Sequence, residues 1–391
     1  MPFTPNLLKT NWNYPTSISF GIGRIKELPF ACKKLNLKRP LLVTDPGLAK
    51  LPMITAAIKL NQSEGIQTGL FSKVKSNPIN QNIQDGVSFY KEGSFDGIIA
   101  WGGGSGIDAA KAIALMVSQS RPIWDFEDTD ENWLRANITK IPKIVAVPTT
   151  SGTGSEVGRA SVITNEESSI KKVIFHPNML PSIVICDPEL VTGLPSNLTA
   201  YTGMDALIHC FEAYCAIGYH PMAEGIALEG MKLVANWLPK AFKDGQDIEA
   251  RAHMMSAAAM GATAFQKGLG AIHSLSHPMS AVYDTHHGLA NAVFMPYVIT
   301  FNKSAIKEKL KVISNHLSLK SPGYIGVIDW VLELCDTFNI PNNSEKLGAR
   351  PEDLDKLAIM AANDPTASGN PVPVGPEEMR NLYQRAFKGF I

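Results

Sequence analysis

The sequence predicts an α/β domain built on a parallel, Rossmann-like sheet with an added β-hairpin, followed by an all-helical domain. Up to about residue 190, short and continuously apolar runs alternate with helical segments, which is typical of parallel strands covered on both faces. Beyond that point the strand signal fades and apolar residues recur at helical spacing. We therefore expect domains over residues 1–190 and 191–391, which suits a chain of 391 residues at roughly 150 residues per domain.

Five short runs of β-type residues are predicted to form the parallel sheet. They are Ser17–Phe20, Leu41–Thr44, Gly97–Trp101, Ile144–Val147 and Ile183–Cys186. Ala160–Thr164 and Lys171–Phe175 differ, because only a polar turn separates these two β-type runs. We expect them to form the hairpin.

Seven segments of the second domain carry apolar residues at helical spacing. They are Leu198–Ala216, Ala223–Phe242, Asp247–Phe265, His273–Tyr283, Ala305–Leu317, Glu352–Ala362 and Pro376–Phe387. Before the first of them, Pro195 supplies a break and Ser196 and Asn197 supply capping residues.

The composition excludes several classes of protein. Lys and Arg together number 36, as do Asp and Glu, so there is no net charge or basic run with which to bind nucleic acid. No stretch approaches 18 consecutive apolar residues, and the longest candidate, Met254–Phe265, is interrupted by polar residues and glycine. A membrane span is therefore not expected, and a small molecule is the expected partner.

The termini and cysteines point to a cytoplasmic protein. The N-terminal stretch MPFTPNLLKTNWNYP lacks the basic head and apolar run of a secretory signal. The five cysteines are odd in number, widely spread and without a CxxC pair. They are expected to be buried or free thiols in a reducing compartment.

A glycine-rich loop, WGGGSGIDAAK at Trp101–Lys111, lies between a predicted strand and a helical run. Its glycines let a ligand approach the backbone, and the following helix N-terminus presents N–H groups and a partial positive charge to a phosphate. The loop fits neither GxGxxG, because Ile107 replaces the last glycine, nor a P-loop. A tight strand-to-helix turn would need the same glycines, with Asp108 as an ordinary helix-dipole partner.

A second loop, PTTSGTGSE at Pro148–Glu156, follows another predicted strand and is rich in hydroxyl groups. Small donors of this kind can surround a sugar or a pyrophosphate, although a surface loop can have the same composition. Because ligands gather at the carboxyl ends of the strands in open α/β sheets, both loops are candidates for one site. Asp45 ends a third strand; it would favour NAD over NADP by repelling a ribose phosphate, but it could equally serve its local turn.

Five histidines concentrate in two places of the helical domain. Asp205 and His209 are spaced i and i+4 on a predicted helix, His273 and His277 repeat that spacing, and His286-His287-Gly288 follows. A carboxylate and several imidazoles are suitable ligands for a divalent transition metal. Spacing alone leaves open which of His273, His277, His286 and His287 bind, and whether the ion is Fe(II), Zn(II), Ni(II) or Co(II).

Four motifs together resemble the iron-containing (group III) alcohol dehydrogenase family. In order, they are GGGSGIDAAK, PTTSGTGSE, GMDALIHCFEAY and GAIHSLSHP…HHGLANAVFMPYV. The resemblance is strongest between Phe20 and Asn302. It implies an N-terminal α/β nucleotide-binding domain, a C-terminal helical metal-binding domain of the dehydroquinate synthase-like fold, and assembly as a homodimer or higher homo-oligomer.

The resemblance also implies roles for individual residues. The metal ligands would be Asp205, His209, His273 and His287, with His277 near the nicotinamide. Contacts to the cofactor would come from Asp45, Asn77, Gly103, Gly104, Ser105, Asp108, Thr149, Thr150, Thr153, Ser155 and Lys171. The implied cofactors are NAD, with NADP less favoured, and Fe(II), with Zn(II) or another divalent metal as the alternative.

Two segments depart from the family pattern. Many members have Pro-His-Gly where this chain has His286-His287-Gly288, which adds an imidazole beside the ligand. Many alcohol-oxidising members have Phe-Asn-Asn-Ala-x-Leu-Gly, whereas this chain has the shorter Phe265-Gln-Lys267-Gly-Leu-Gly270. Phe265 and Lys267 are therefore candidate residues of the substrate pocket.

The expected activity is an NAD(P)- and metal-dependent alcohol dehydrogenase or aldehyde reductase that transfers hydride between nicotinamide and a small substrate. The metal would act as a Lewis acid on the substrate oxygen, and His277 is a candidate for passing the proton to solvent. His277 could instead only pack against the nicotinamide or orient a water. Physiologically, we expect reduction of a short aldehyde.

Other activities remain open at this stage. Lys267 could recognise an anionic semialdehyde, although a lysine at a helix end is often only solvated, and a hydroxyacid–oxoacid transhydrogenase is closely related. A dehydroquinate synthase-like lyase ranks low, because Asp205–His287 contains few basic residues. A non-catalytic metal or nucleotide sensor would leave the two loops and the ligand cluster without a catalytic purpose.

Overall fold

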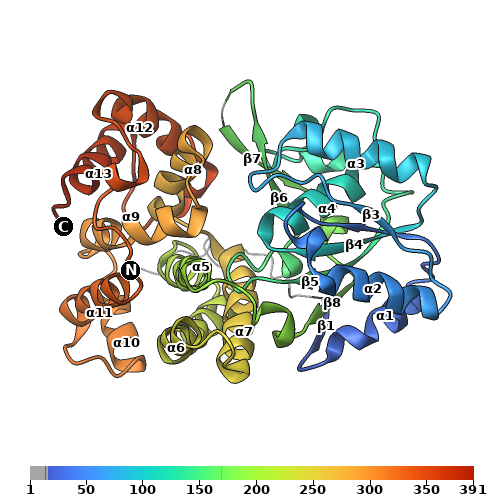
Figure 1. Cartoon of the computed structure of the whole chain (residues 1–391). Helices are drawn as coiled ribbons and strands as arrows, with labels where there is room; N and C mark the ends of the chain where they lie inside the picture. The colour runs from blue at the N-terminus through green and yellow to red at the C-terminus, as the bar shows by residue number, and fades with distance from the viewer. Residues whose placement is uncertain (1–13, 15, 169) are drawn as a thin grey trace. The chain divides into compact units, whose positions relative to one another are not determined.

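The computed structural model describes residues 14, 16–168 and 170–391 (Figure 1). The described chain divides into two compact units, one ending at Gly193 and the other beginning at Leu194. The N-terminal stretch expected to lack a secretory signal lies outside the described residues, apart from Tyr14.

The first unit contains the expected parallel sheet, with six strands in the order β1-β8-β5-β4-β2-β3. Every neighbouring pair is parallel. The strands are β1 (Ser17–Phe20), β2 (Pro40–Val43), β3 (Gly69–Phe71), β4 (Gly97–Gly102), β5 (Lys143–Pro148) and β8 (Ile183–Cys186). β2, β4 and β8 are buried along their whole length, which explains why these segments are apolar without alternation.

The register places the three candidate loops, which follow β2, β4 and β5, at the same edge of the sheet. Val43 pairs with Ala100, and Gly102 pairs with Pro148. The chain therefore leaves β2, β4 and β5 at neighbouring points on their carboxyl ends. The sequence analysis did not identify β3, because three residues are too few to show a periodic pattern.

Helices cover both faces of this sheet (Figure 1). Helices α1 (Leu28–Lys34) and α2 (Pro52–Ser63) share a core with one face, which includes Trp101 and Val145. Helices α3 (Asn80–Glu92) and α4 (Gly104–Met116) pack on each other, and α4 lies against β4 and β5. The predicted hairpin is confirmed, with β6 (Ala160–Asn165) antiparallel to β7 (Ile170–Phe175).

All α- and β-elements between Leu194 and Ile391 are helices, as expected, and the structure describes this whole range. They are α5 (Ser196–Cys215), α6 (Pro221–Lys243), α7 (Ile248–Ala264), α8 (Ala271–Tyr283), α9 (His287–Asn302), α10 (Lys307–His316), α11 (Gly323–Thr337), α12 (Leu354–Ala362) and α13 (Pro376–Lys388). Helix α5 contacts α6, α7 and α9, and its second half is buried throughout. The central helix of this unit is therefore the one that carries the Asp205 motif.

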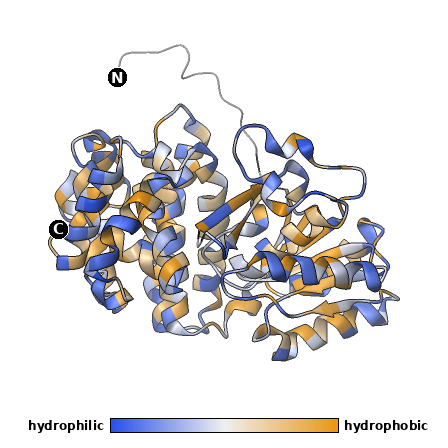
Figure 2. Ribbon diagram, turned by 90° about the horizontal axis from the view of Figure 1, so that it is seen from above, coloured by the Kyte–Doolittle hydropathy of each residue, from blue (hydrophilic) through white to orange (hydrophobic). Residues whose placement is uncertain are grey.

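Two helices of this unit, α9 and α11, were not predicted. Most of α9 is buried, including the run from Ala290 to Ile299. A helix that is apolar all round shows no amphipathic period, so the pattern that identifies surface helices was absent. By contrast, many helices in Figure 2 carry hydrophilic and hydrophobic residues on one ribbon.

Two further expectations concern the chain as a whole. The five cysteines are free and buried, as predicted, and burial raises the pKa of the Cys210 thiol to about 12. Among the helices of the described residues, none has both the length and the apolar character needed to span a bilayer.

Candidate metal centre and nucleotide-binding loops

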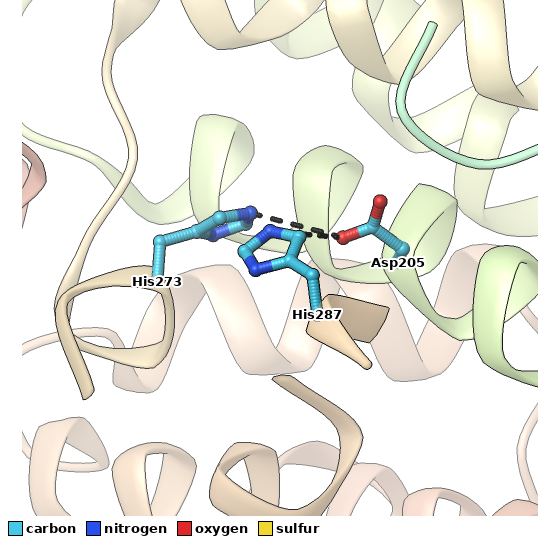
Figure 3. Close-up of side chains that lie close together, drawn as sticks. All are labelled: Asp205, His273 and His287. Carbon is cyan, nitrogen blue, oxygen red and sulfur yellow. Dashed lines mark ion pairs between the residues drawn. The ribbon is translucent and has the colours of Figure 1, made fainter. Parts of the chain in front are cut away.

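Four side chains from three helices meet around one carboxylate oxygen. Asp205 and His209 project from α5, one turn apart, while His273 lies on α8 and His287 opens α9. The Nε2 atoms of the three histidines lie 3.8, 3.9 and 3.7 Å from Asp205 Oδ1, in chain order. Figure 3 shows Asp205, His273 and His287 pointing toward one another, and one ligand atom from each lies within 4.8 Å of the others.

Packing holds these imidazoles in place. Asp205, His209 and His273 are buried, whereas the His287 side chain keeps 25% of its surface exposed. The rings of His209 and His273 stack with centroids 4.8 Å apart. His287 is therefore the most accessible member of the cluster.

Asn291, one turn after His287 on α9, marks the point on which the cluster converges. Its amide nitrogen donates to Asp205 Oδ1 at 2.8 Å and lies 3.3 Å from His273 Nε2 and 3.1 Å from His287 Nε2. A carboxylate oxygen and two imidazole nitrogens thus face a single donor. The same oxygen and nitrogen atoms can serve as metal ligands, so their convergence on one point fits a divalent transition metal.

The helices that carry the ligands are in very close contact next to the cluster. A Cβ atom at Gly288 would lie 2.1 Å from the Tyr201 carbonyl oxygen of α5 and 3.2 Å from Asp205 Cβ. Only glycine allows α9 to approach α5 so closely directly after His287. Gly288 therefore sets the spacing between two of the ligand-bearing helices.

Glu212, two turns after Asp205 on α5, contacts the far side of one imidazole. Its Oε2 atom lies 2.6 Å from His273 Nδ1. Burial by itself would lower the pKa of His273, but the hydrogen bond and charge of Glu212, with the charge of Asp205, raise it above its usual value. The sequence analysis missed Glu212, although its spacing places it on the helix face of Asp205 and His209.

His277 lies beside the cluster. Its ring stacks on His287 with centroids 5.2 Å apart, and its Nδ1 lies 2.7 Å from Asp364 Oδ2. Burial alone would raise the pKa of Asp364, but His277 and Thr366 hold it below its usual range. His286, the additional imidazole, packs against Tyr201 at 5.3 Å between ring centroids.

The two candidate pocket residues lie in different surroundings. The edge of the Phe265 ring contacts His209, with centroids 5.1 Å apart. Lys267 has a buried side chain, and its ammonium donates to Glu224 at 2.6 Å and to the Tyr214 carbonyl at 3.0 Å. Burial, with the nearby charge of Lys309, lowers the pKa of Lys267 to about 8.

In the α/β unit, hydrogen bonds tie together the loops expected to bind the nucleotide. The backbone N–H of Thr149 donates to Gly102 at 2.9 Å, and the Ser105 hydroxyl donates to the Ser76 carbonyl, next to Asn77. Gly104 opens α4 so close to the second loop that a Cβ there would lie 2.5 Å from Thr153 Oγ1. Gly103, Thr150 and Asn77 are half-buried in these loops.

Asp45 and Lys171 are both half-buried. Oδ1 of Asp45 accepts the backbone N–H groups of Gly47 at 2.8 Å and Leu48 at 2.9 Å, so this oxygen shapes the turn after β2. Lys171 pairs with Thr164 across the hairpin.

Asp108 and Ser155 are buried and bonded to the protein itself. The Ser155 hydroxyl donates to Asp108 Oδ1, and Val162 N–H donates to Asp108 Oδ2 at 3.0 Å. Lys111, which the sequence analysis did not single out, is also buried; its ammonium donates to the Ser155 carbonyl at 3.0 Å and lies 3.3 Å from Asp108. These three residues, the loop brace, join α4 to the second loop and the hairpin.

Comparison with known proteins agrees with this architecture. The model of the iron-containing alcohol dehydrogenase family matches residues 15–188, and that of its C-terminal domain matches residues 199–387. The chain is 35% identical to 4-hydroxybutyrate dehydrogenase of Cupriavidus necator, over 95% of this chain and 98% of that protein. It is 33% identical to NAD-dependent methanol dehydrogenase of Bacillus methanolicus, over 96% of this chain and 100% of the relative.

A solved structure of 1,3-propanediol oxidoreductase superposes with a TM-score of 0.91 and 32% identity, covering 97% of this chain and 100% of the other. The iron-containing alcohol dehydrogenase from Thermotoga maritima superposes with a TM-score of 0.84 and 27% identity, covering 97% and 99%. This chain therefore belongs to the iron-containing alcohol dehydrogenase family, as an NAD-linked, metal-dependent oxidoreductase.

Proposed function

We propose that this enzyme interconverts short alcohols and aldehydes with NAD, and that it works mainly as an aldehyde reductase. The observation that carries the proposal is the convergence of three imidazoles on Asp205 Oδ1 at 3.7–3.9 Å. The related alcohol dehydrogenases named above support the same reaction class. Short alcohols or aldehydes are the substrates that fit this family.

The proposed ligands of the metal are Asp205, His209, His273 and His287, with Fe(II) as the ion and Zn(II) as the alternative. When bound, a divalent cation supplies Lewis-acid stabilisation of negative charge on the substrate oxygen, worth several kcal/mol at the transition state. The chain's own contribution is to hold the four side chains at fixed positions, through the stacked rings and the contact at Gly288.

The α/β unit is proposed to hold NAD at the carboxyl edge of its sheet. Gly103, Gly104 and Ser105 lead into α4, whose N-terminal N–H groups suit a pyrophosphate. Thr149, Thr150 and Thr153 offer hydroxyl groups from the neighbouring loop, and the remaining proposed contacts are Asn77, Lys171 and Asp45. For Asp108 and Ser155 the buried loop brace supports an indirect role, in which they hold the loops in position.

Asp45 is proposed to favour NAD over NADP, since a carboxylate repels a ribose phosphate. Asp45→Gly should improve NADP binding relative to NAD, measured as the ratio of dissociation constants. An unchanged ratio would mean that Asp45 only stabilises its local turn, where it accepts hydrogen bonds from the N–H groups of Gly47 and Leu48.

His277 is proposed to pass a proton between the substrate oxygen and water, close to the nicotinamide. Asp364 Oδ2 lies 2.7 Å from His277 Nδ1, so Nε2 is the ring nitrogen that can exchange the proton. An imidazole suits this task because its ordinary pKa is near neutral. His277→Ala should slow turnover more than it weakens cofactor binding.

A second candidate is reduction of a semialdehyde with an anionic tail. The similarity to 4-hydroxybutyrate dehydrogenase favours it, but the ammonium of Lys267 is already paired with Glu224. That pairing supports neutral aldehydes as the substrates. If Lys267→Ala selectively slows turnover of anionic aldehydes while sparing neutral ones, the semialdehyde is the better assignment.

The decisive experiment combines elemental analysis with NAD and NADP assays across a panel of alcohols and aldehydes. We expect about one divalent ion per chain and net NADH formation from a short alcohol alone. Dependence on an added oxoacid would indicate a transhydrogenase, and a metal-loaded protein that oxidises no alcohol would indicate a sensor.

We further propose a cytoplasmic location, consistent with five free cysteines, and a homodimer or higher homo-oligomer. Analytical ultracentrifugation of the purified protein measures the assembly directly.

A further inference from the structure

Glu212 accepts three hydrogen bonds from the start of α8. Its Oε2 accepts from Gly270 N–H at 3.0 Å, and its Oε1 accepts from Ile272 N–H at 2.7 Å. The third contact joins Oε2 to His273 Nδ1 at 2.6 Å. The residue is only 5% exposed, so water does not compete strongly for this carboxylate.

These contacts specify which nitrogen of His273 carries the proton. An ionised carboxylate can only accept hydrogen bonds, so the short contact to Glu212 requires the proton on Nδ1. The Nε2 atom then presents its lone pair toward Asp205 and the other histidines.

The opposite side of the ring favours the same tautomer. The Asn291 amide group is oriented by Asp205 Oδ1, which accepts from its nitrogen at 2.8 Å. That nitrogen also lies 3.3 Å from His273 Nε2, where a second N–H would face the amide donor, so the contact favours a lone pair on Nε2. Two partners, one on each ring nitrogen, thus favour the tautomer protonated at Nδ1.

We propose that Glu212 is a positioning residue of the metal centre, which fixes the tautomer and the ring orientation of His273 so that Nε2 is ready to bind the ion. The inference rests on the proposed function, because it assumes that the cluster around Asp205 holds a metal. Outer carboxylates that accept from a ligating histidine raise the ligand's basicity and limit its motion. The same carboxylate also caps α8, so one side chain sets both the helix start and the ligand.

Glu212→Gln separates these two duties. A glutamine with its oxygen at the Oε1 position still accepts from Ile272. Its amide nitrogen, in place of Oε2, cannot accept from Gly270; it donates to His273 Nδ1, which would shift the His273 proton to Nε2, the atom needed by the ion. The Zn²⁺ dissociation constant of the metal-free protein, measured by competition with a chromophoric chelator, should rise about 10–100-fold. The unfolding midpoint of the metal-free variant should fall only by the effect of the lost Gly270 hydrogen bond, because the bond from Ile272 is kept.

Asp247→Asn is the matched control. Asp247 also accepts a backbone N–H at the start of a helix, from Ala250 of α7 at 3.0 Å, but the structure records no imidazole contact for it among residues 194–391. Its Zn²⁺ affinity should match that of the parent protein.

The outcomes distinguish the inference from the proposed function. Equal Zn²⁺ affinity in Glu212→Gln and the parent protein would overturn the positioning role and leave the function intact. A parent protein that binds no Zn²⁺ through these histidines would overturn both. Histidine ¹⁵N spectra of the metal-free parent protein test the inference without any variant: we expect His273 protonated at Nδ1, and the Nε2 tautomer would contradict it.

Discussion

The two units use the polar residues of their motifs in opposite ways. In the helical unit, side chains singled out as ligands converge on Asp205, with Nε2 atoms 3.7–3.9 Å from its Oδ1. In the α/β unit, Asp108 and Ser155 were expected to touch the cofactor, yet both are buried and bonded to the protein. Loops that bind a ligand with backbone and small residues need other side chains to hold their shape, whereas a metal needs the side chains themselves.

This difference between the two units predicts different effects for substitutions in each of them. Substitution of a clustered histidine should weaken metal binding, substitutions at a tight helix contact or a buried carboxyl should change stability, and a change at a loop glycine should weaken NAD binding. The four tests below run from the largest expected effect to the smallest.

His273→Ala should have the largest effect, because it removes a proposed ligand rather than an outer partner. We expect Zn²⁺ affinity to fall by more than the ~10–100-fold typical of outer-partner loss, together with activity, while NAD binding persists. His253→Ala, which removes a partly exposed imidazole stacked on Trp237, should change neither. Full metal occupancy at a normal rate in His273→Ala would remove it from the ligand set.

Gly288→Ala should destabilise the helical unit by about 3 kcal/mol, because overpacking against a backbone carbonyl is hard to relieve. The new Cβ would lie 2.1 Å from Tyr201 O. The control is Gly225→Ala in α6, where a Cβ meets nothing within 4 Å, so it should stabilise by up to ~1 kcal/mol. Urea unfolding of the metal-free proteins measures both, and equal effects would mean that the α5–α9 contact is looser than described.

Glu156→Gln should change the pH dependence of stability without changing metal binding. Burial raises the pKa of Glu156 from 4.5 to about 7, so between these values the folded state binds more protons than the unfolded state. Stability contributed by this group is therefore present below pH 4.5 and lost as pH rises through 7, by an amount on the order of 3 kcal/mol.

The Gln variant should lose this slope and gain stability over the parent protein at pH 8. Unfolding midpoints measured from pH 5 to pH 8 test the prediction. Glu131→Gln, at an exposed position of the same unit, should leave the slope unchanged. Parallel pH profiles for Glu156→Gln and the parent protein would argue against a raised pKa for this buried carboxyl.

Gly104→Ala should weaken NAD binding about tenfold, equivalent to ~1.4 kcal/mol, because the added methyl group displaces Thr153 from the neighbouring loop. Zn²⁺ affinity should be unaffected, which serves as the internal control. Isothermal titration with NAD measures the change. Adding Thr153→Ala, which removes the obstructing atoms, should restore part of the loss if crowding is the cause.

Much of the architecture follows from local pattern. Strands β2, β4 and β8 are buried and continuously apolar, as is β5 after the exposed Lys143, and the amphipathic helices have a clear period, so both could be predicted. Helix α9 could not, because burial on all sides removes the period. That helix carries His287, which its motif identified as a candidate ligand, and Asn291, which the sequence analysis missed and which contacts Asp205 of α5.

The candidate site was predictable where spacing along one helix places residues together. Asp205 with His209, and His273 with His277, share faces for that reason. Partners from distant segments were not predictable: Asp364 meets His277 across 87 positions of sequence, and Lys111 meets the second loop from within α4. Lysine in an ordinary helical run gives no sign that it will be buried.

The contact at Gly288 has a consequence for how the centre acquires its ion. Because α9 rests on the backbone of α5 beside Asp205, the two helices have little freedom to separate or close. The metal site is thus preorganised, and little conformational entropy is lost when an ion binds. Loading should then be governed by how fast the hydrated ion sheds its water, which favours labile aqua ions over those that exchange water slowly.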